Sequence, residues 1–153
     1  MSADILNLGA GNNIKGNALN HDRTAHRREI AAVWDLNNLP WPWADDSFGR
    51  IVAVSVLEHL RLNLVESLDE CWRILRPGGH IYLKVPHWQS DTSHQDPTHY
   101  WYFSLKSFDQ FDPETERGKE YSFYTPRKWR LLAPPPTLNK GASSIIARLA
   151  VRK

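Results

Sequence analysis

Four short polar segments each come at the end of an apolar run, and their residue types are suited to binding a ligand. They are Gly9-Ala10-Gly11, Asp22, Asp35 with Leu36, and Ser55 to His59. Glycines lack side chains and let backbone N–H groups approach a ligand closely. A carboxylate at the end of a strand can accept two hydroxyl protons from a ribose, and one beside a backbone N–H can bind an adenine edge. The four segments in this order predict a nucleoside-type ligand.

A second group of titratable side chains lies in the segment HWQSDTSHQDPTHYW, residues 87–101. Three interpretations stay open: a general base, a structural loop whose imidazoles hydrogen-bond locally, and a divalent metal site built from His94, Asp96 and His99. Because the spacing of these three residues matches no strict metal-binding pattern, we predict no metal. Glu58 is expected to be structural. The candidate catalytic residues are His94, His99, Asp96 and His59.

The elements that would position these residues alternate between strands and a helix. Apolar runs predict strands over residues 4–8, 18–22, 30–36, 51–57 and 80–85, and the continuous run at 51–57 is typical of a sheet covered on both faces. Apolar residues at helical spacing predict a helix over residues 62–75, ended by Pro77-Gly78-Gly79. This order predicts an α/β fold with a Rossmann-like, open and mostly parallel sheet.

Three features modify this plan. Between Gly11 and Ala18 the chain offers only Asn-Asn-Ile-Lys-Gly-Asn, so the first crossover helix should be reduced to a loop or a single turn. Two adjacent late runs, residues 128–132 and 144–151, predict an antiparallel C-terminal end of the sheet. Residues 88–124 are polar and aromatic without strong periodicity, and we interpret them as a lid or substrate-binding insertion in a single domain of residues 1–153.

Composition narrows the class of protein. The 153 residues are 41% hydrophobic and 24% charged, as is usual for a soluble globular domain. No apolar run could span a bilayer and the N-terminus has no export signal, so we expect a cytoplasmic protein with no membrane partner. The single cysteine, Cys71, is expected to be buried. A net charge of +2 without a long Lys/Arg block gives only weak support to nucleic-acid binding.

A nicotinamide dinucleotide site is the first rival for the glycine turn. Its phosphate fingerprint needs a glycine three residues after Gly11, where Ile14 stands. The chain instead resembles the class I S-adenosylmethionine-dependent methyltransferases, and within them the small methyltransferase-11-like group. It departs from their pattern at Asn7, where the family often has an acid, and at Asn13, which replaces a third glycine. The resemblance covers about residues 4–86 and rests on LNLGAGNN, NHD, WDLNNLPWPWADDSFGRIVAVSVLEHL and ECWRILRPGGHIYLKVP.

The resemblance implies S-adenosylmethionine as the cofactor. The glycine turn would face its methionine portion, and Asp22 would hold the ribose. Asp35 with Leu36 would hold the adenine, and Ser55 would contact the amino acid end. The positions of this chain that match the cofactor motifs are Gly9, Ala10, Gly11, Asp22, Asp35, Leu36 and Ser55.

We therefore expect methyl transfer from S-adenosylmethionine to an acceptor, with a small molecule or a sugar favoured. The alternatives are a non-catalytic S-adenosylmethionine-binding interaction module and an RNA-binding protein that stacks bases on loop tryptophans. The reduced first crossover should leave Val, Ile and Leu side chains exposed on the sheet near the first three strands, which predicts a homodimer or larger assembly. The loop tryptophans that could line a pocket are Trp41, Trp43, Trp88 and Trp101.

Overall fold

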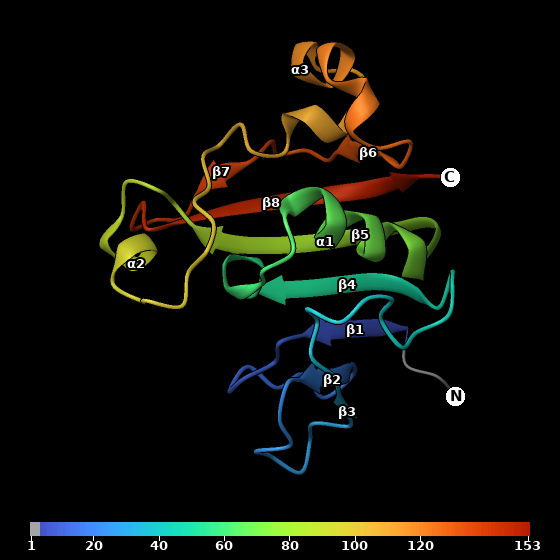
Figure 1. Ribbon diagram of the computed structural model, residues 1–153, viewed down its shortest axis with the longest axis vertical. Coiled ribbons are helices and arrows are strands. Elements are labelled where there is room, and N and C mark those ends of the chain that lie inside the picture. The colour runs from blue at the N-terminus through green and yellow to red at the C-terminus, as the bar shows by residue number, and fades with distance from the viewer. Residues whose placement is uncertain (1–3) are drawn as a thin grey trace.

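The computed structural model describes residues 4–153, and its centre is one eight-stranded sheet (Figure 1). The strand order is β3-β2-β1-β4-β5-β8-β6, with β7 paired to β8. Pairs among β1 to β5 are parallel, and the pairs that β8 makes with β5, β6 and β7 are antiparallel, which confirms the predicted fold class. The strands are β1 (Ile5–Leu8), β2 (Leu19–Asp22), β3 (Ala32–Val33), β4 (Phe48–Val54), β5 (Leu75–Pro86), β6 (Lys128–Leu131), β7 (Thr137–Leu138) and β8 (Ser144–Arg152).

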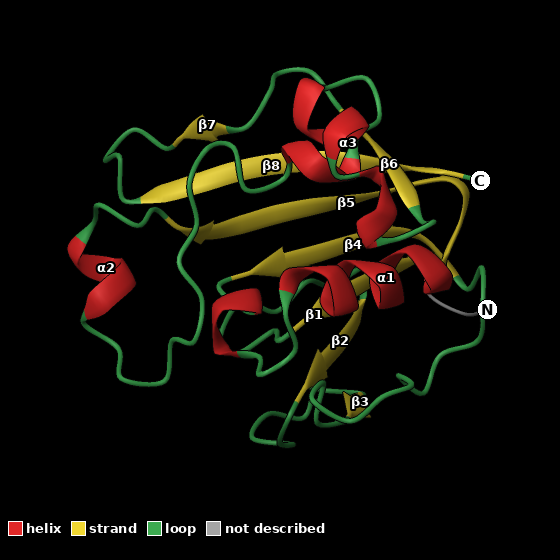
Figure 2. Cartoon of the chain, turned by 45° about the horizontal axis from the view of Figure 1, so that its top comes forward, coloured by secondary structure: helices red, strands yellow, loops and turns green. Residues whose placement is uncertain are grey.

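The helix α1 (Leu64–Ile74) has three turns and lies between β4 and β5 in the sequence. It packs on one face of the sheet, and Figure 2 shows it in front of the strands. It begins where Asn63 and Glu66 form a reciprocal capping box. Its buried face includes Cys71, as predicted. No helix within residues 4–153 is long and apolar enough to cross a bilayer. The shorter helical pieces are α2 (Asp91–His94), α3 (Glu116–Glu120) and the 3-10 turns η1 (Leu57–His59), η2 (Asp109–Phe111) and η3 (Ser122–Tyr124).

Three predicted boundaries are wrong. The strand expected at 30–36 is reduced to β3, Ala32–Val33. The strand expected at 51–57 is β4, which begins at Phe48 and ends at Val54, because Ser55 has a φ of 55° and turns the chain into η1. The strand β5 follows α1 directly and runs through Pro77-Gly78-Gly79, which therefore lie inside a strand. Gly78, with a φ of 79°, and a register shift between Phe48 and Arg50 accommodate this irregular start.

The connection between β1 and β2 contains no helix, as predicted, and buried asparagines hold it instead. Asn7 Nδ2 donates hydrogen bonds to Asn20 Oδ1 and to the Asn13 carbonyl, both at 2.8 Å. Asn20 Nδ2 donates to the Lys15 carbonyl at 2.9 Å, and Asn20 Oδ1 accepts from the Lys15 N–H at 3.0 Å. Asn7 and Asn20 are 1% and 5% exposed. The loop is therefore anchored by side chains from the two strands it joins.

The predicted insertion, residues 88–124, divides into several parts. Phe103, Phe108 and Phe111 are at most 3% exposed and belong to the main hydrophobic core. Residues 103–111 are thus part of the folded body, whereas residues 88–102 extend beyond it at the α2 end and α3 projects at the β6 edge of the sheet (Figure 1). The interpretation as a lid is accordingly narrowed to residues 88–102.

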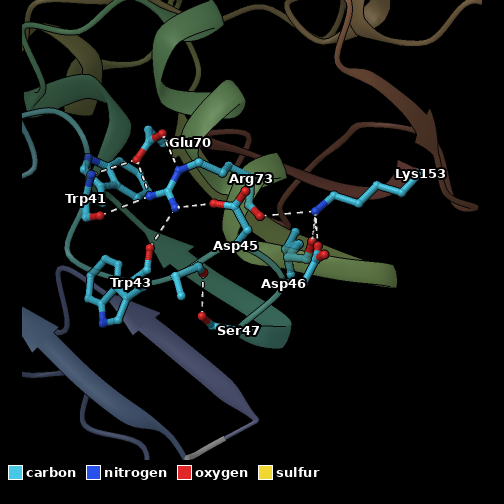
Figure 3. A network of polar contacts seen from close by, with 10 residues as sticks. Trp41, Trp43, Asp45, Asp46, Ser47, Glu70, Arg73 and Lys153 are labelled. Carbon is cyan, nitrogen blue, oxygen red and sulfur yellow. Dashed lines mark hydrogen bonds and ion pairs between the residues drawn. The ribbon is translucent and has the colours of Figure 1, made fainter.

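A polar network fastens the loop before β4 to α1 (Figure 3). Arg73 donates hydrogen bonds to Glu70, to Asp45 and to the Trp41 and Trp43 carbonyls, and Glu70 also accepts from the Trp41 N–H at 2.7 Å. Burial alone would raise the pKa of Glu70, but the hydrogen bonds from Arg73 and Trp41 outweigh it and lower that pKa. Trp41 is 2% exposed and Trp43 packs beside it, so these two tryptophans support the core and do not line a pocket.

One face of the sheet carries α1, and the other receives no helix from the connections at residues 9–18 and 23–31. The sheet is therefore not covered on both faces as the apolar run at 51–57 suggested. We expected exposed apolar side chains near β1 to β3, where the open face carries the buried Asn7 and Asn20 and where Val33 of β3 is 51% exposed. Farther along the same face, the aligned positions across β4, β5, β8 and β6 hold Arg50, Val52, Val54, His80, Tyr82, Lys84, Ile146, Arg148, Ala150, Arg130, Lys128 and Arg152.

We expect Asn20→Ala to lower the free energy of unfolding by about 2–4 kcal/mol, because it leaves buried groups of Asn7 and Lys15 without partners. Chemical denaturation followed by circular dichroism measures this. The exposed Asn38 provides the matched control, and Asn38→Ala should change stability by less than about 0.5 kcal/mol. Equal effects of the two substitutions would contradict the anchoring role of Asn20.

Candidate active site

A cavity of about 230 Å³ lies at the carboxyl ends of β1, β2 and β4, where an open α/β sheet forms its ligand crevice. Five of the seven predicted cofactor residues line it: Gly9, Asp22, Asp35, Leu36 and Ser55. Ala10 and Gly11 do not. His59, predicted as a candidate catalytic residue, also lines the cavity. The sequence reasoning missed the other lining residues, which lie next to predicted ones in the chain or beside the η1 turn: His21, Arg23, Trp34, Asn37, Val56 and Leu60.

The glycine turn is shaped by its own conformation and by Asp22. Gly9 and Gly11 have φ angles of 54° and 50°, which favour glycine. A Cβ atom on Gly9 would lie 2.6 Å from a methyl group of Val56, so the turn also needs glycine for space. The Gly11 N–H donates to Asp22 Oδ2 at 2.7 Å. Asp22 therefore holds the turn in place while it lines the cavity, and Ala10, 3% exposed, packs beneath the turn.

Asp35 lies two residues beyond the end of β3 and faces the same cavity. Its Oδ1 accepts hydrogen bonds from the Asn37 N–H at 3.0 Å and from the Asn37 side chain at 2.9 Å, and Arg23 Nε lies 3.7 Å from its Oδ2. The Asn37 backbone hydrogen bond, followed by the Asn37 side chain and Arg23, lowers the pKa of Asp35. Leu36 and Trp34 supply the apolar wall beside this carboxylate.

A second cavity of about 550 Å³ continues from the first. The two share Arg23, Asp35, Asn37 and His59, and we call the combined space the cleft. Its outer part is polar and open, and it adds lining residues from the β3–β4 connection, from the link between η1 and α1, and from residues 88–102. Those residues are Asn38, Arg61, Thr98 and Tyr100.

Glu58, His59 and His99 come together at the wall of the cleft, and their candidate ligand atoms lie within 4.8 Å of one another. Glu58 is fully buried, and neither carboxylate oxygen has a hydrogen-bond partner among the described residues. Burial raises the pKa of Glu58 to about 7. Burial also lowers the pKa of His59, and the neighbouring His99 adds to this effect. The rings of the two histidines meet edge to face at 4.6 Å.

The other two candidate catalytic residues lie outside this cluster. His94 Nε2 is 2.7 Å from the Trp88 carbonyl oxygen, and its ring stacks on Tyr102. Asp96 accepts hydrogen bonds from the N–H and the hydroxyl of Thr98, and its Oδ2 is 4.0 Å from His99 Nε2. The structure thus unites His59 with His99, adds Glu58 in place of His94, and leaves Asp96 as a neighbour.

Comparisons with known proteins agree with this architecture. The family model described as "Methyltransferase domain", of the methyltransferase-11 type, matches residues 7–83. A comparison with curated proteins gives no significant match.

Solved structures of the same fold include YcgJ from Bacillus subtilis, with a TM-score of 0.56 at 16% identity, covering 98% of this chain and 91% of that one. A putative methyltransferase in complex with the Haloferax volcanii Trm112 activator has a TM-score of 0.66 at 13% identity, covering 99% and 84%. CalH in complex with SAH has a TM-score of 0.64 at 14% identity, covering 99% and 52%. At these identities the structures establish the fold, and together with the matched family model they show that the chain belongs to the class I S-adenosylmethionine-dependent methyltransferases of the methyltransferase-11 family.

Proposed function

We propose that the cleft binds S-adenosylmethionine and that the protein transfers its methyl group to a hydroxyl-bearing small molecule or sugar. The observation that carries this proposal is the arrangement of two carboxylates around one cavity. Asp22 and Asp35 follow successive strands and line that cavity together with the glycine turn. This arrangement suits a ribose and an adenine on one side and the amino acid portion of the cofactor on the other.

The transfer itself is an in-line displacement that depends mainly on positioning. The acceptor oxygen forms a bond to the methyl carbon while the carbon–sulfur bond breaks, and its electron pair passes to sulfur to leave S-adenosylhomocysteine. The hydroxyl proton of the acceptor must also leave. We propose that the Glu58–His59–His99 cluster activates the acceptor, because His59 lines both parts of the cleft whereas His94 is engaged elsewhere.

The proposed acceptor side of the cleft is formed by residues 88–102. This segment is tied to the η1 turn, since the Tyr100 N–H donates to the Glu58 carbonyl at 2.7 Å and the Trp101 indole donates to the Leu60 carbonyl at 2.8 Å. Tyr100 is 50% exposed and lines the outer cleft. A firmly attached segment with an exposed aromatic ring is suited to hold an acceptor beside the methyl group.

Two alternatives to the enzyme are a non-catalytic cofactor-binding module and an RNA-binding protein, and a measurement of methyl transfer distinguishes the enzyme from both. A non-catalytic module would bind S-adenosylmethionine without releasing the methyl group to any acceptor. Of the four loop tryptophans, Trp88 and Trp101 are exposed and could stack on bases, whereas Trp41 and Trp43 support the core. The homodimer and the cytoplasmic location stay predictions from the sequence.

Asp22→Ala should weaken S-adenosylmethionine binding by about 1.5–3 kcal/mol, because the ribose loses charge-assisted hydrogen bonds. Asp35→Ala should have a smaller effect, since Leu36 still offers its backbone N–H. Isothermal calorimetry with folded variants measures both affinities. Unchanged affinity in Asp22→Ala would show that the ribose lies elsewhere, and an equal loss in Asp35→Ala would contradict the ranking.

Tyr100→Ala should leave cofactor affinity within about twofold of the original and lower methyl transfer at least tenfold on any acceptor that the protein accepts. Calorimetry and release of S-adenosylhomocysteine measure the two quantities. Tyr124, a tyrosine of similar exposure in η3, provides the control, and Tyr124→Ala should change neither. Full turnover in Tyr100→Ala would remove residues 88–102 from the acceptor site.

A further inference from the structure

The cluster of Glu58, His59 and His99 has its two imidazoles oriented by a second layer of hydrogen bonds. His99 Nδ1 lies 3.0 Å from the Ser93 carbonyl oxygen, which can only accept, so Nδ1 carries the proton. The Thr98 hydroxyl donates to Asp96 at 2.7 Å, and its oxygen lies 2.8 Å from His59 Nδ1. That oxygen is then the acceptor for a protonated His59 Nδ1. Both neutral imidazoles therefore present an Nε2 lone pair.

This arrangement of histidines is the one that metal sites use. A histidine that binds a metal through one ring nitrogen almost always donates the other N–H to a carbonyl or carboxylate, directly or through a short relay. Here the partners are the Ser93 carbonyl for His99 and the Thr98–Asp96 relay for His59. Asp96 thus acts on His59 through Thr98, although the sequence suggested it as a direct ligand.

Glu58 supplies an independent observation. Its carboxylate is fully buried, and both of its oxygens lack a hydrogen-bond partner among residues 4–153. A buried carboxylate in that condition is costly unless a proton or a cation satisfies it. The candidate ligand atoms of Glu58, His59 and His99 lie within 4.8 Å of one another. Donors bound at about 2.1 Å to one ion lie about 3–3.4 Å apart, so a small inward movement would complete the site.

We propose that Glu58, His59 and His99 bind one divalent first-row transition-metal ion, of the class Zn²⁺, Mn²⁺, Fe²⁺, Co²⁺ or Ni²⁺. Two imidazoles and one carboxylate favour these ions over Mg²⁺ and Ca²⁺, which prefer oxygen donors. Three protein ligands leave coordination positions on the ion open. Because His59 lines both parts of the cleft, these open positions would face the cleft. This assignment replaces the sequence-based expectation of no metal, and it also differs from a site of His94, Asp96 and His99.

The role of the ion rests on the proposed methyl transfer, whereas its binding does not. An ion at this wall of the cleft would hold an acceptor hydroxyl as a ligand and lower its pKa, so that the oxygen reaches the methyl group as a stronger nucleophile. Acceptors with a hydroxyl able to reach the ion would therefore be preferred.

The test is metal binding by the full chain after treatment with EDTA. Zn²⁺, Mn²⁺ and Co²⁺ are titrated by calorimetry, and the absorption spectrum of the Co²⁺ form is recorded. We expect one ion per chain, and at least 100-fold weaker binding in Glu58→Gln and in His99→Asn. Asp96→Asn should weaken binding about 10- to 100-fold through the relay. His94→Asn is the matched control from the same segment and should bind as the original protein does.

Two outcomes would overturn the metal site: no binding by the folded protein at 100-fold molar excess of every ion tested, or original affinity in both Glu58→Gln and His99→Asn. Circular dichroism verifies folding, and if one variant fails to fold the other decides. S-adenosylmethionine affinity is measured on the metal-free protein in parallel. Metal binding without cofactor binding would refute the proposed function alone, and the reverse would refute the metal site alone.

The open face of the sheet carries a second, independent inference. Arg50, Lys84 and Arg148 occupy neighbouring rows of β4, β5 and β8, while Arg130 in β6 and Lys15 in the first loop extend the set. None of these five cations has an ion-pair partner within the part of the chain that the structure describes. No Asp or Glu stands among the aligned open-face positions given above, and the acids beside them, Asp112 and Glu114, pair with Arg152 on the last row.

We propose that this face binds the phosphate backbone of a single-stranded nucleic acid. Positions two apart on a strand are about 7 Å from each other, a spacing that suits successive phosphates. The Arg148 guanidinium lies over the Tyr82 ring, 5.4 Å from its centre, and offers a flat platform on which a base can stack. A second copy of the chain is disfavoured there because it would place like charges opposite one another.

Fluorescence anisotropy with labelled 12-nucleotide oligo(U) and oligo(dT), over a range of salt concentrations, tests this proposal. The double variant Arg50→Gln/Arg148→Gln should weaken binding at least tenfold and reduce the salt slope by about 0.7 per lost phosphate contact. Arg28→Gln, at an exposed arginine of the β2–β3 connection, is the control and should change neither. No binding at 50 mM salt, or equal binding by the double variant, would overturn the proposal. A dimer in light scattering that the double variant abolishes would assign the face to a second copy instead.

Discussion

The hydrogen bonds between Asn7, Asn20 and the first loop are the interaction on which this small α/β domain depends. A parallel crossover commonly includes a helix whose backbone satisfies its own polar groups. Here the connection is too short for one, so the Lys15 backbone and the Asn13 carbonyl take their partners from buried amide side chains. An amide suits this place because it donates and accepts at once, which a carboxylate cannot do. The chain therefore carries Asn7 where its family often has an acid.

The missing helices determine the surface as well as the core. With α1 as the one helix of three turns among residues 4–153, one face of the sheet is packed and the other is open. Val52 on the open face is nevertheless only 4% exposed, and it lines one shallow cavity together with Lys15, Arg50 and Lys84. The positive charge of these side chains disfavours contact with the same face of a second copy, and it attracts a polyanion. The same shortening that simplified the fold thus produced a charged surface.

The cleft and the cluster beside it arise from four separate parts of the chain. The glycine turn and Asp22 come from the first two strands, Asp35 from the segment after β3, Glu58 and His59 from the η1 turn, and His99 from the segment beyond β5. The hydrogen bond from Tyr100 to the Glu58 carbonyl fixes the last segment against the turn. Together with the hydrogen bonds from Trp101 to the Leu60 carbonyl and between His59 and Thr98, this contact brings His99 close to the buried, unpartnered Glu58 carboxylate.

The sequence by itself determined the α/β class, the helix α1, the helix-free first crossover and five of the residues that line the cleft, because local periodicity and strand ends express them directly. It named His59 and His99 as candidates but could not identify the cluster, since Glu58 was expected to be structural and His99 lies 41 positions from it. It also placed Trp41 and Trp43 at a pocket, whereas Arg73 and Glu70 draw their loop into the core. Side-chain burial and contacts between distant segments are properties of the tertiary structure, so only the folded chain decided them.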